Sequence, residues 1–113
     1  KVKILAHPTA RLLEKRDSIE ADWNKIFERC AEKNRAIEIN ASPQRLDLPD
    51  ILVKQAIKKG VRLAINTDAH SVDQMEGMKW GVSVARRGGA KKHDIINTMS
   101  YNEVKKWISE VKN

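Results

Sequence analysis

The sequence predicts an α/β protein with a small parallel sheet, because short apolar runs alternate with helical patterns along the chain. Three runs have the brief, β-branched and mostly apolar character of strands that are covered on both faces: Val2 to Ala6, Ala36 to Asn40 and Arg62 to Thr67. A helical pattern follows each run, and this order favours parallel strands joined by helical crossovers. A further helical pattern closes the chain.

The first two helices are indicated by apolar side chains at helical spacing. Asp17-Ser18-Ile19-Glu20 has the form of a capping box and predicts the start of the first helix. Its apolar face comprises Ile19, Trp23, Ile26, Phe27, Cys30 and Ala31. Pro49 is tolerated in the first turn of the second helix, and Gly60 predicts its end. The apolar side of that helix comprises Leu52, Val53, Ala56 and Ile57.

Two later helices also begin at capping boxes. Ser71-Val72-Asp73-Gln74 predicts the start of the third helix, and Gly88-Gly89 predicts its end. The stripe expected to face the core comprises Met75, Met78, Val82 and Ala85. Residues 92–97 are expected to form one or two turns. Ser100-Tyr101-Asn102-Glu103 predicts a last helix, which is expected to bury Val104, Trp107, Ile108 and Val111.

The length suggests a part of a larger domain. The chain has 113 residues, enough for one modest domain. Three strands leave two long unpaired edges, which are a liability and a route to self-association. A closed barrel of this type usually takes about 250 residues. We therefore expect the last three βα units of a barrel-like domain, cut from a longer chain, although deliberate shortening of the chain would also explain a start at Lys1.

Composition and charge favour a cytoplasmic protein that meets polyanions. No apolar run approaches the roughly 20 residues that span a bilayer, and no signal peptide is recognisable. The lone Cys30 fits a reducing compartment, and its place on an apolar helix face makes it a poor nucleophile. The net charge of +7 favours nucleic acid or phosphorylated substrates, but a soluble lysine-rich surface explains it equally well.

Polar side chains follow all three expected strands. His7 follows the first strand, Asn40 ends the second, and Asp68 and His70 follow the third. The C-terminal ends of parallel strands share one edge, where active sites of such folds lie. Two imidazoles and a carboxylate there suit a transition metal such as Zn²⁺ or Mn²⁺. The Asp-x-His pair alone would equally fit a capping Asp beside a core His; His7 at the equivalent position favours the metal.

Other polar residues have two possible roles each. Glu38 lies inside an apolar strand, where an unpaired carboxylate would be costly, so it either orients a histidine ligand or pairs with a buried Arg. Arg11 and Arg45 lie in loops where either could hold a phosphate. Asn40 could contact substrate or be a turn residue. No Gly-rich phosphate loop, nucleophile elbow or dinucleotide fingerprint is present, so no catalytic side chain is assigned.

The segments "ILAHPTARLLEKR", "EINASPQRLDLPD" and "INTDAHS" resemble a known family. They are similar to the C-terminal part of the PHP (polymerase and histidinol phosphatase) domain of bacterial and archaeal family X DNA polymerases, and the likeness continues through "YNEVKKWI". The resemblance implies the last three βα units and C-terminal helix of a distorted (βα)7 TIM-like barrel. It also implies a multinuclear site for Mn²⁺ or Zn²⁺ and a phosphoesterase that acts as a 3′–5′ exonuclease on DNA.

By this resemblance His7 matches the third metal-binding motif, and Asp68 and His70 match the fourth. The family's His-x-His motif and second histidine motif are expected upstream of Lys1, as is the polymerase module. The implied partners are those missing parts and single-stranded DNA or 3′ ends, and the fragment alone is expected to be inactive or nearly so. The alternatives are a small-molecule phosphatase of the histidinol-phosphatase type and a non-catalytic DNA-binding or structural fragment.

Overall fold

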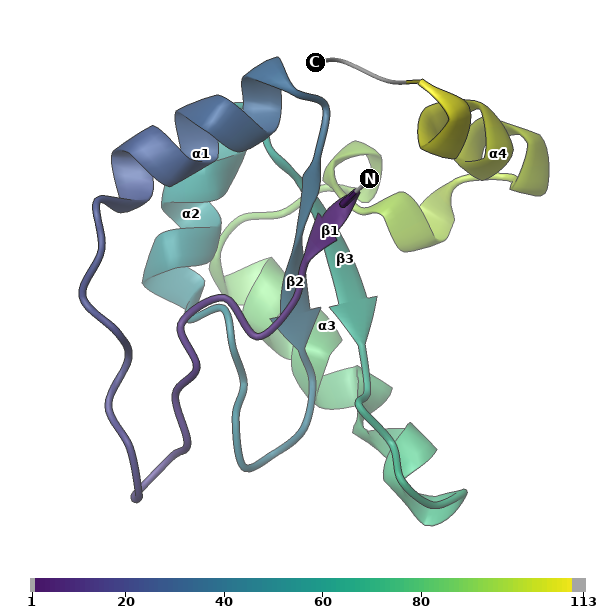
Figure 1. Cartoon of the computed structure of the whole chain (residues 1–113). Coiled ribbons are helices and arrows are strands. Elements are labelled where there is room, and N and C mark those ends of the chain that lie inside the picture. Colours follow the sequence, from purple (N-terminus) through teal and green to yellow (C-terminus); the bar gives the residue numbers. More distant parts are fainter. Residues whose placement is uncertain (1, 111–113) are drawn as a thin grey trace.

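The computed structural model describes residues 2–110, which form three parallel strands with helices on both faces of the sheet (Figure 1). The strands are β1 (Ile4–Leu5), β2 (Ala36–Asn40) and β3 (Arg62–Asn66), in the order β1-β2-β3. In the register between β2 and β3, Asn40 lies opposite Asn66. The predicted α/β class and parallel sheet are confirmed, and β2 has the predicted bounds.

Four α-helices and three 3-10 segments connect and cover the strands. The α-helices are α1 (Trp23–Glu32), α2 (Asp50–Lys58), α3 (Met78–Arg87) and α4 (Tyr101–Ser109). The 3-10 segments are η1 (Asp73–Gly77), η2 (Lys92–Asp94) and η3 (Ile96–Thr98). No helix within residues 2–110 has the length and apolar character needed to cross a membrane.

The main core lies between one face of the sheet and the helices α1, α2 and α3. Side chains alternate between the faces of a strand, and Ile37 and Ile39 of β2 point to this core together with Leu63 and Ile65 of β3. Phe27 of α1 is fully buried among them. Burying one such side chain contributes about 1.5–3 kcal/mol.

The other face of the sheet is apolar at the start of the strands and polar at their C-terminal ends. At the start of the strands, Ala36 and Ala64 form a small cluster with Trp107 of α4, whose indole N–H donates to the carbonyl of Asn34 at 3.0 Å. Figure 1 shows α4 at this end, away from the arrowheads. Toward the arrowheads the same face carries Glu38 and Asn40, so polar side chains gather where the strands end.

One of the two sheet edges expected to be unpaired is in fact paired. The side-chain amide of Asn97 accepts from the N–H of Ile65 and donates to its carbonyl, both at 2.8 Å. Leu63 also forms a bridge with Ile95. The amide of Asn97 therefore takes the place of a neighbouring strand beside β3. Within the described part of the chain, β1 pairs with β2 alone, so the edge of β1 that faces away from β2 is unpaired.

The first helix starts later than predicted. Its N-cap is Asp22, whose carboxylate accepts from the N–H of Lys25 at 3.2 Å, and the proposed box at residues 17–20 is not helical. The N–H of Ile19 donates to the carbonyl of Thr9 at 2.9 Å, and the Ile19 side chain is exposed. This long-range bond holds the segment against the loop after β1. The second helix ends before Gly60 as predicted, where φ is +80°, but Pro49 is its N-cap and not a residue of its first turn.

The third helix also differs from its prediction. The 3-10 turn η1 precedes α3, and the side chain of Gln74 accepts from the N–H of His70 at 2.7 Å instead of completing a capping box. Met75 and Val82 are exposed, and the buried residues of α3 are Gly81, Val84 and Ala85. The missing Cβ of Gly81 allows α3 to approach the sheet closely, and this contact decides which face is buried.

The last helix begins at the predicted capping box. Ser100 Oγ accepts from the N–H of Glu103 at 3.2 Å, and the carboxylate of Glu103 accepts from the N–H of Ser100 at 2.6 Å. Trp107 is buried as predicted, whereas Ile108 is exposed, because the helix covers the sheet with one narrow side. Val111 lies outside the described residues.

Candidate metal-binding site

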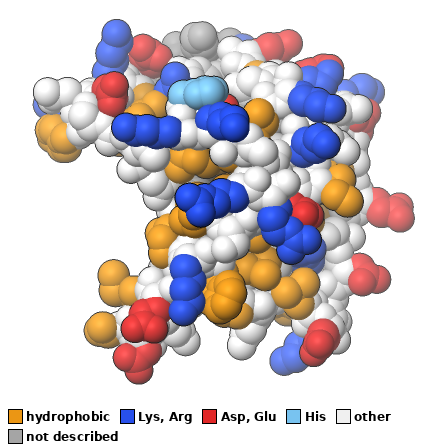
Figure 2. All heavy atoms as spheres, turned by 180° about the vertical axis from the view of Figure 1, so that it is seen from behind, with side chains coloured by type: hydrophobic (Ala, Val, Ile, Leu, Met, Phe, Trp, Pro, Cys, Tyr) orange, Lys and Arg blue, Asp and Glu red, His pale blue; other side chains and the backbone are white. Residues whose placement is uncertain are grey.

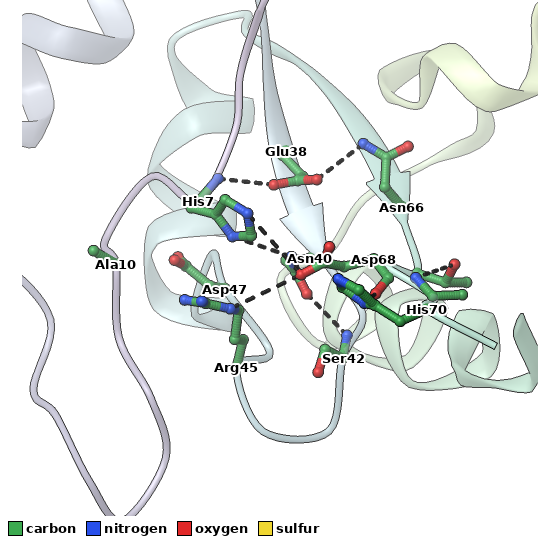
Figure 3. Close-up of polar contacts among 12 residues, drawn as sticks. His7, Ala10, Glu38, Asn40, Ser42, Arg45, Asp47, Asn66, Asp68 and His70 are labelled. Atoms are coloured by element: carbon green, nitrogen blue, oxygen red, sulfur yellow. Dashed lines mark hydrogen bonds and ion pairs between the residues drawn. The ribbon is translucent and has the colours of Figure 1, made fainter. Parts of the chain in front are cut away.

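The candidate site lies at the C-terminal edge of the sheet, where the loops after the three strands meet (Figure 3). His7 is in the loop after β1, Asn40 is the last residue of β2, and Asp68 and His70 are in the loop after β3. The structure brings His7, Asn40 and Asp68 together, whereas the contact of the His70 ring is with the backbone oxygen of Asp68 and not with its carboxylate.

His7 and Asp68 approach each other and share a contact with Asn40. His7 Nε2 lies 4.0 Å from Asp68 Oδ2, and both side chains are partly exposed. Asn40 Nδ2 is 3.2 Å from His7 Nδ1 and 3.2 Å from Asp68 Oδ2. The other end of the Asn40 amide accepts from the N–H of Ser42 at 3.0 Å, which orients the amide. His7 Nδ1 is therefore an acceptor in this arrangement, and the proton of the neutral ring is on Nε2.

His70 is oriented by the backbone of Asp68. Its Nδ1 lies 2.8 Å from the carbonyl oxygen of Asp68, which can only accept, so Nδ1 carries a proton. In the neutral ring Nε2 then keeps its lone pair, which is the usual arrangement of a histidine that binds a metal. His70 is exposed, and its backbone N–H donates a hydrogen bond to the side-chain oxygen of Gln74.

Both His7 and Asp68 have left-handed backbone conformations. Their φ values are +45° and +54°, a region that costs a non-glycine residue about 1 kcal/mol. Conformations of this kind cluster at functional sites. The loops contain further examples, at Ala10, Glu14, Asn34 and Leu46.

Glu38 positions the loop that carries His7. Its side chain is buried, and the residue is 5% exposed. One carboxylate oxygen accepts from the backbone N–H of His7 at 2.8 Å, and the other accepts from the side chain of Asn66 at 3.1 Å. Glu38 therefore bonds the backbone of His7 and not its ring, and among the described residues its hydrogen-bond partners are His7 and Asn66, with no arginine.

The two candidate phosphate-binding arginines lie in different surroundings. The guanidinium of Arg11 donates to the carbonyls of Arg45, at 2.9 Å, and Leu46, so it ties the loop after β1 to the loop after β2. Burial lowers the pKa of Arg11, an effect that the nearby carboxylates of Asp47 and Asp50 oppose. Arg45 Nε instead lies 4.0 Å from Asp68 Oδ2 and faces the site.

Two residues near the site were not predicted from the sequence. Asp47 is fully buried and accepts from the Thr9 N–H at 3.1 Å and from the Thr9 hydroxyl at 2.8 Å. The sequence pattern marks it only as part of a helix start before Pro49. Asn66 holds Glu38 and lies opposite Asn40 in the sheet. The alternation of side chains along β3 was a signal that could have identified Asn66.

A cleft of about 540 Å³ adjoins the site. Its lining includes the loops after β2 and β3 and the start of α3, with Arg45, Asp68, His70, Lys79 and Trp80. Within residues 2–110, no group of three or more His, Cys, Asp or Glu side chains is arranged to hold a metal ion.

The parallel sheet covered by helices places the chain in the α/β class, and polar side chains gather at the C-terminal edge of this sheet. Comparison with known proteins is more specific. The chain is 39% identical over 107 residues to the DNA polymerase/3'-5' exonuclease PolX of Bacillus subtilis (strain 168). The match covers 95% of this chain and 19% of that relative, so the chain spans about a fifth of the relative's length. No protein-family model matches. The resemblance to a bacterial family X DNA polymerase is thereby confirmed.

Proposed function

We propose that residues 1–113 are the C-terminal portion of a PHP domain in a family X DNA polymerase, and that this domain is a metal-dependent phosphoesterase that degrades DNA from its 3′ end. The observation that carries the proposal is the approach of His7 and Asp68, from separate strand ends, to 4.0 Å. The similarity to a protein named as a DNA polymerase and 3'-5' exonuclease supports the same substrate.

The donor atoms suit a divalent transition metal such as Mn²⁺ or Zn²⁺ in type and spacing. Bonds from zinc to nitrogen and oxygen ligands are about 2.0–2.2 Å, so two ligands at a tetrahedral angle lie about 3.4 Å apart. A small side-chain rotation brings His7 Nε2 and Asp68 Oδ2 to that separation from 4.0 Å. His70 offers a lone pair on Nε2. For His7 to bind a metal ion through Nε2, the proton on Nε2 must move to Nδ1. The side-chain amide of Asn40 must then turn its N–H away from Nδ1.

By the resemblance to the PHP domain, the ligands supplied by this chain are His7, Asp68 and His70, and other parts of that domain supply the rest. A bound cation supplies charge stabilisation for the phosphoryl oxygens and makes water a better nucleophile. The residues of this chain hold the metal ion and orient its ligands and the substrate. Glu38 fixes the backbone of His7, and Arg45 binds the phosphate beside Asp68. No side chain is needed as a covalent nucleophile.

The test compares two histidines in the full-length protein. His70→Ala is expected to abolish Mn²⁺-dependent degradation of a 3′-labelled single-stranded DNA, while circular dichroism shows a folded protein. His93→Ala is the matched control, because His93 is exposed in η2 and pairs with its sequence neighbour Asp94. Full activity of His70→Ala would remove His70 from the site.

Metal analysis of the full-length protein separates the other candidates. Bound metal with hydrolysis of small phosphomonoesters, but not of DNA ends, would indicate a small-molecule phosphatase. No bound metal in either the fragment or the full-length protein would indicate a structural or DNA-binding segment. Residues 1–113 alone are expected to hydrolyse little or no DNA.

A further inference from the structure

Trp80 is a large aromatic side chain that the core does not use. The buried side of α3 is formed by Gly81, Val84 and Ala85, and Trp80 is 48% exposed. It lines the same cleft of about 540 Å³ as Asp68 and His70. An exposed indole in a cleft beside the candidate site offers a flat apolar surface to a molecule that reaches the site.

Cationic groups lie on both sides of this cleft. Lys79 Nζ lies 5.2 Å from the centre of the Trp80 ring. Arg45 lines the cleft on the side of Asp68, 24% of its side chain being exposed. Figure 2 shows lysine and arginine side chains gathered over the face that carries α3, with hydrophobic side chains exposed between them. The cleft lining also contains the carboxylates of Asp68, Asp73 and Glu76, which outnumber its two cations, so charge alone does not attract a polyanion to it.

We propose that Trp80 is a stacking platform for a base near the 3′ end of single-stranded DNA, with Lys79 and Arg45 meeting the adjacent phosphates. The inference rests on the proposed function and names a substrate-positioning residue for it. Any base can stack on an aromatic side chain, because each base has a π-face. Stacking does not require a uniformly positive surface around the aromatic ring. Lys79 Nζ lies over the indole ring, so a base that stacks on this face displaces the ammonium group, which then meets the phosphate of the same nucleotide.

A protein segment is the main rival occupant of this surface. Val72, just before η1, and Met75, within η1, are exposed apolar side chains close to Trp80 in sequence. The exposed aromatic face of Trp80, in the same cleft as Asp68 and His70, favours a nucleic acid, because a base can stack on it beside the candidate site. A covering protein segment is therefore an outcome that the experiment must recognise.

The first experiment measures two substrates in the full-length protein with Mn²⁺: a single-stranded oligonucleotide and the small diester bis(p-nitrophenyl) phosphate. Trp80→Ala is expected to lower the ratio of kcat/KM for DNA to that for the diester by about tenfold, mainly through KM for DNA. Trp80→Phe is expected to restore most of this ratio, since it keeps an aromatic face. Tyr101→Ala, which removes an aromatic side chain that is 78% exposed on α4, is the matched control.

The second experiment measures binding without hydrolysis. Fluorescence anisotropy of labelled oligo(dT) in EDTA is expected to show about tenfold weaker binding for Trp80→Ala, and unchanged binding for Tyr101→Ala. An unchanged substrate ratio with unchanged binding, or an equal loss on both substrates, would overturn the inference and point to a covering segment or a structural role. If the unmodified protein hydrolyses neither substrate, the proposed function fails, and the binding experiment still decides the role of Trp80.

Discussion

The carboxylate of Glu38 accepts a hydrogen bond from the backbone N–H of His7 at 2.8 Å, so a buried side chain of the central strand holds the loop that follows β1. The same carboxylate binds Asn66 of β3 at 3.1 Å. Glu38 thereby joins the central strand to the loop after β1 and to the end of β3, and it fixes the backbone of His7.

Glu38→Ala is expected to lower the free energy of unfolding by about 1–3 kcal/mol, because the His7 N–H and the Asn66 amide lose their acceptor. Glu38→Gln should lose less, since its carbonyl still accepts from His7 when the Asn66 amide turns over. Urea denaturation measures the difference, with the exposed Glu20→Ala as the control. In the full-length protein, Glu38→Ala should also weaken Mn²⁺ binding by about 10–100-fold. Wild-type stability of Glu38→Ala would contradict this role.

Arg11→Lys is expected to affect stability more than substrate binding. Arg11 donates from two nitrogens to two backbone carbonyls, and a lysine cannot reproduce this planar fork. We expect the free energy of unfolding to fall by about 1.5–3 kcal/mol in urea denaturation, with KM for DNA nearly unchanged. The control is Arg29→Lys, an exposed partner of Glu32. A raised KM at unchanged stability would instead support the phosphate-binding role expected from the sequence.

Gly81→Ala is expected to destabilise the contact between α3 and the sheet. A Cβ at this position would lie 2.5 Å from Ile65 Cγ2 and 2.7 Å from Ala41 Cβ, so the helix must move. Overpacking costs about 1–3 kcal/mol, and the better helix propensity of Ala offsets up to about 1 kcal/mol of it. Gly77→Ala is the control, since its Cβ would make an ordinary contact of 3.5 Å. Thermal unfolding that shows the two variants to be equally stable would refute the close approach.

Glu103→Gln is expected to reduce the dependence of stability on pH in the acid range. The backbone N–H of Ser100, followed by its side chain, lowers the pKa of Glu103 below its usual value of about 4.3. A lowered folded-state pKa means that the stabilisation is present above the unfolded pKa and is lost as the pH falls through the folded pKa. Urea denaturation between neutral pH and about pH 3 should therefore show a shallower decline for Glu103→Gln than for Glu20→Gln. Parallel curves for the two variants would exclude the effect.

Much of the fold follows from local patterns. The bounds of β2 were predicted correctly because a run of β-branched and apolar residues is buried on both faces. The capping box of Ser100 and Glu103 was predictable because its bonds join residues three apart. The gathering of His7, Asn40 and Asp68 at one edge was also expected, because parallel strands bring their C-terminal ends together.

Contacts between distant segments decided the rest. The bond from Ile19 to Thr9 keeps a plausible capping box out of the first helix, and the close approach of Gly81 to Ile65 turns α3 so that Val82 is exposed. Met75 is exposed because it lies in η1, before α3 begins. The bonds of Arg11 to loop carbonyls join residues with no sequence pattern in common. Local spacing predicts which residues share a face or an edge. Only the folded chain determines which hydrogen-bond donor meets which acceptor, because the partners come from different loops whose paths depend on the packing of the whole domain.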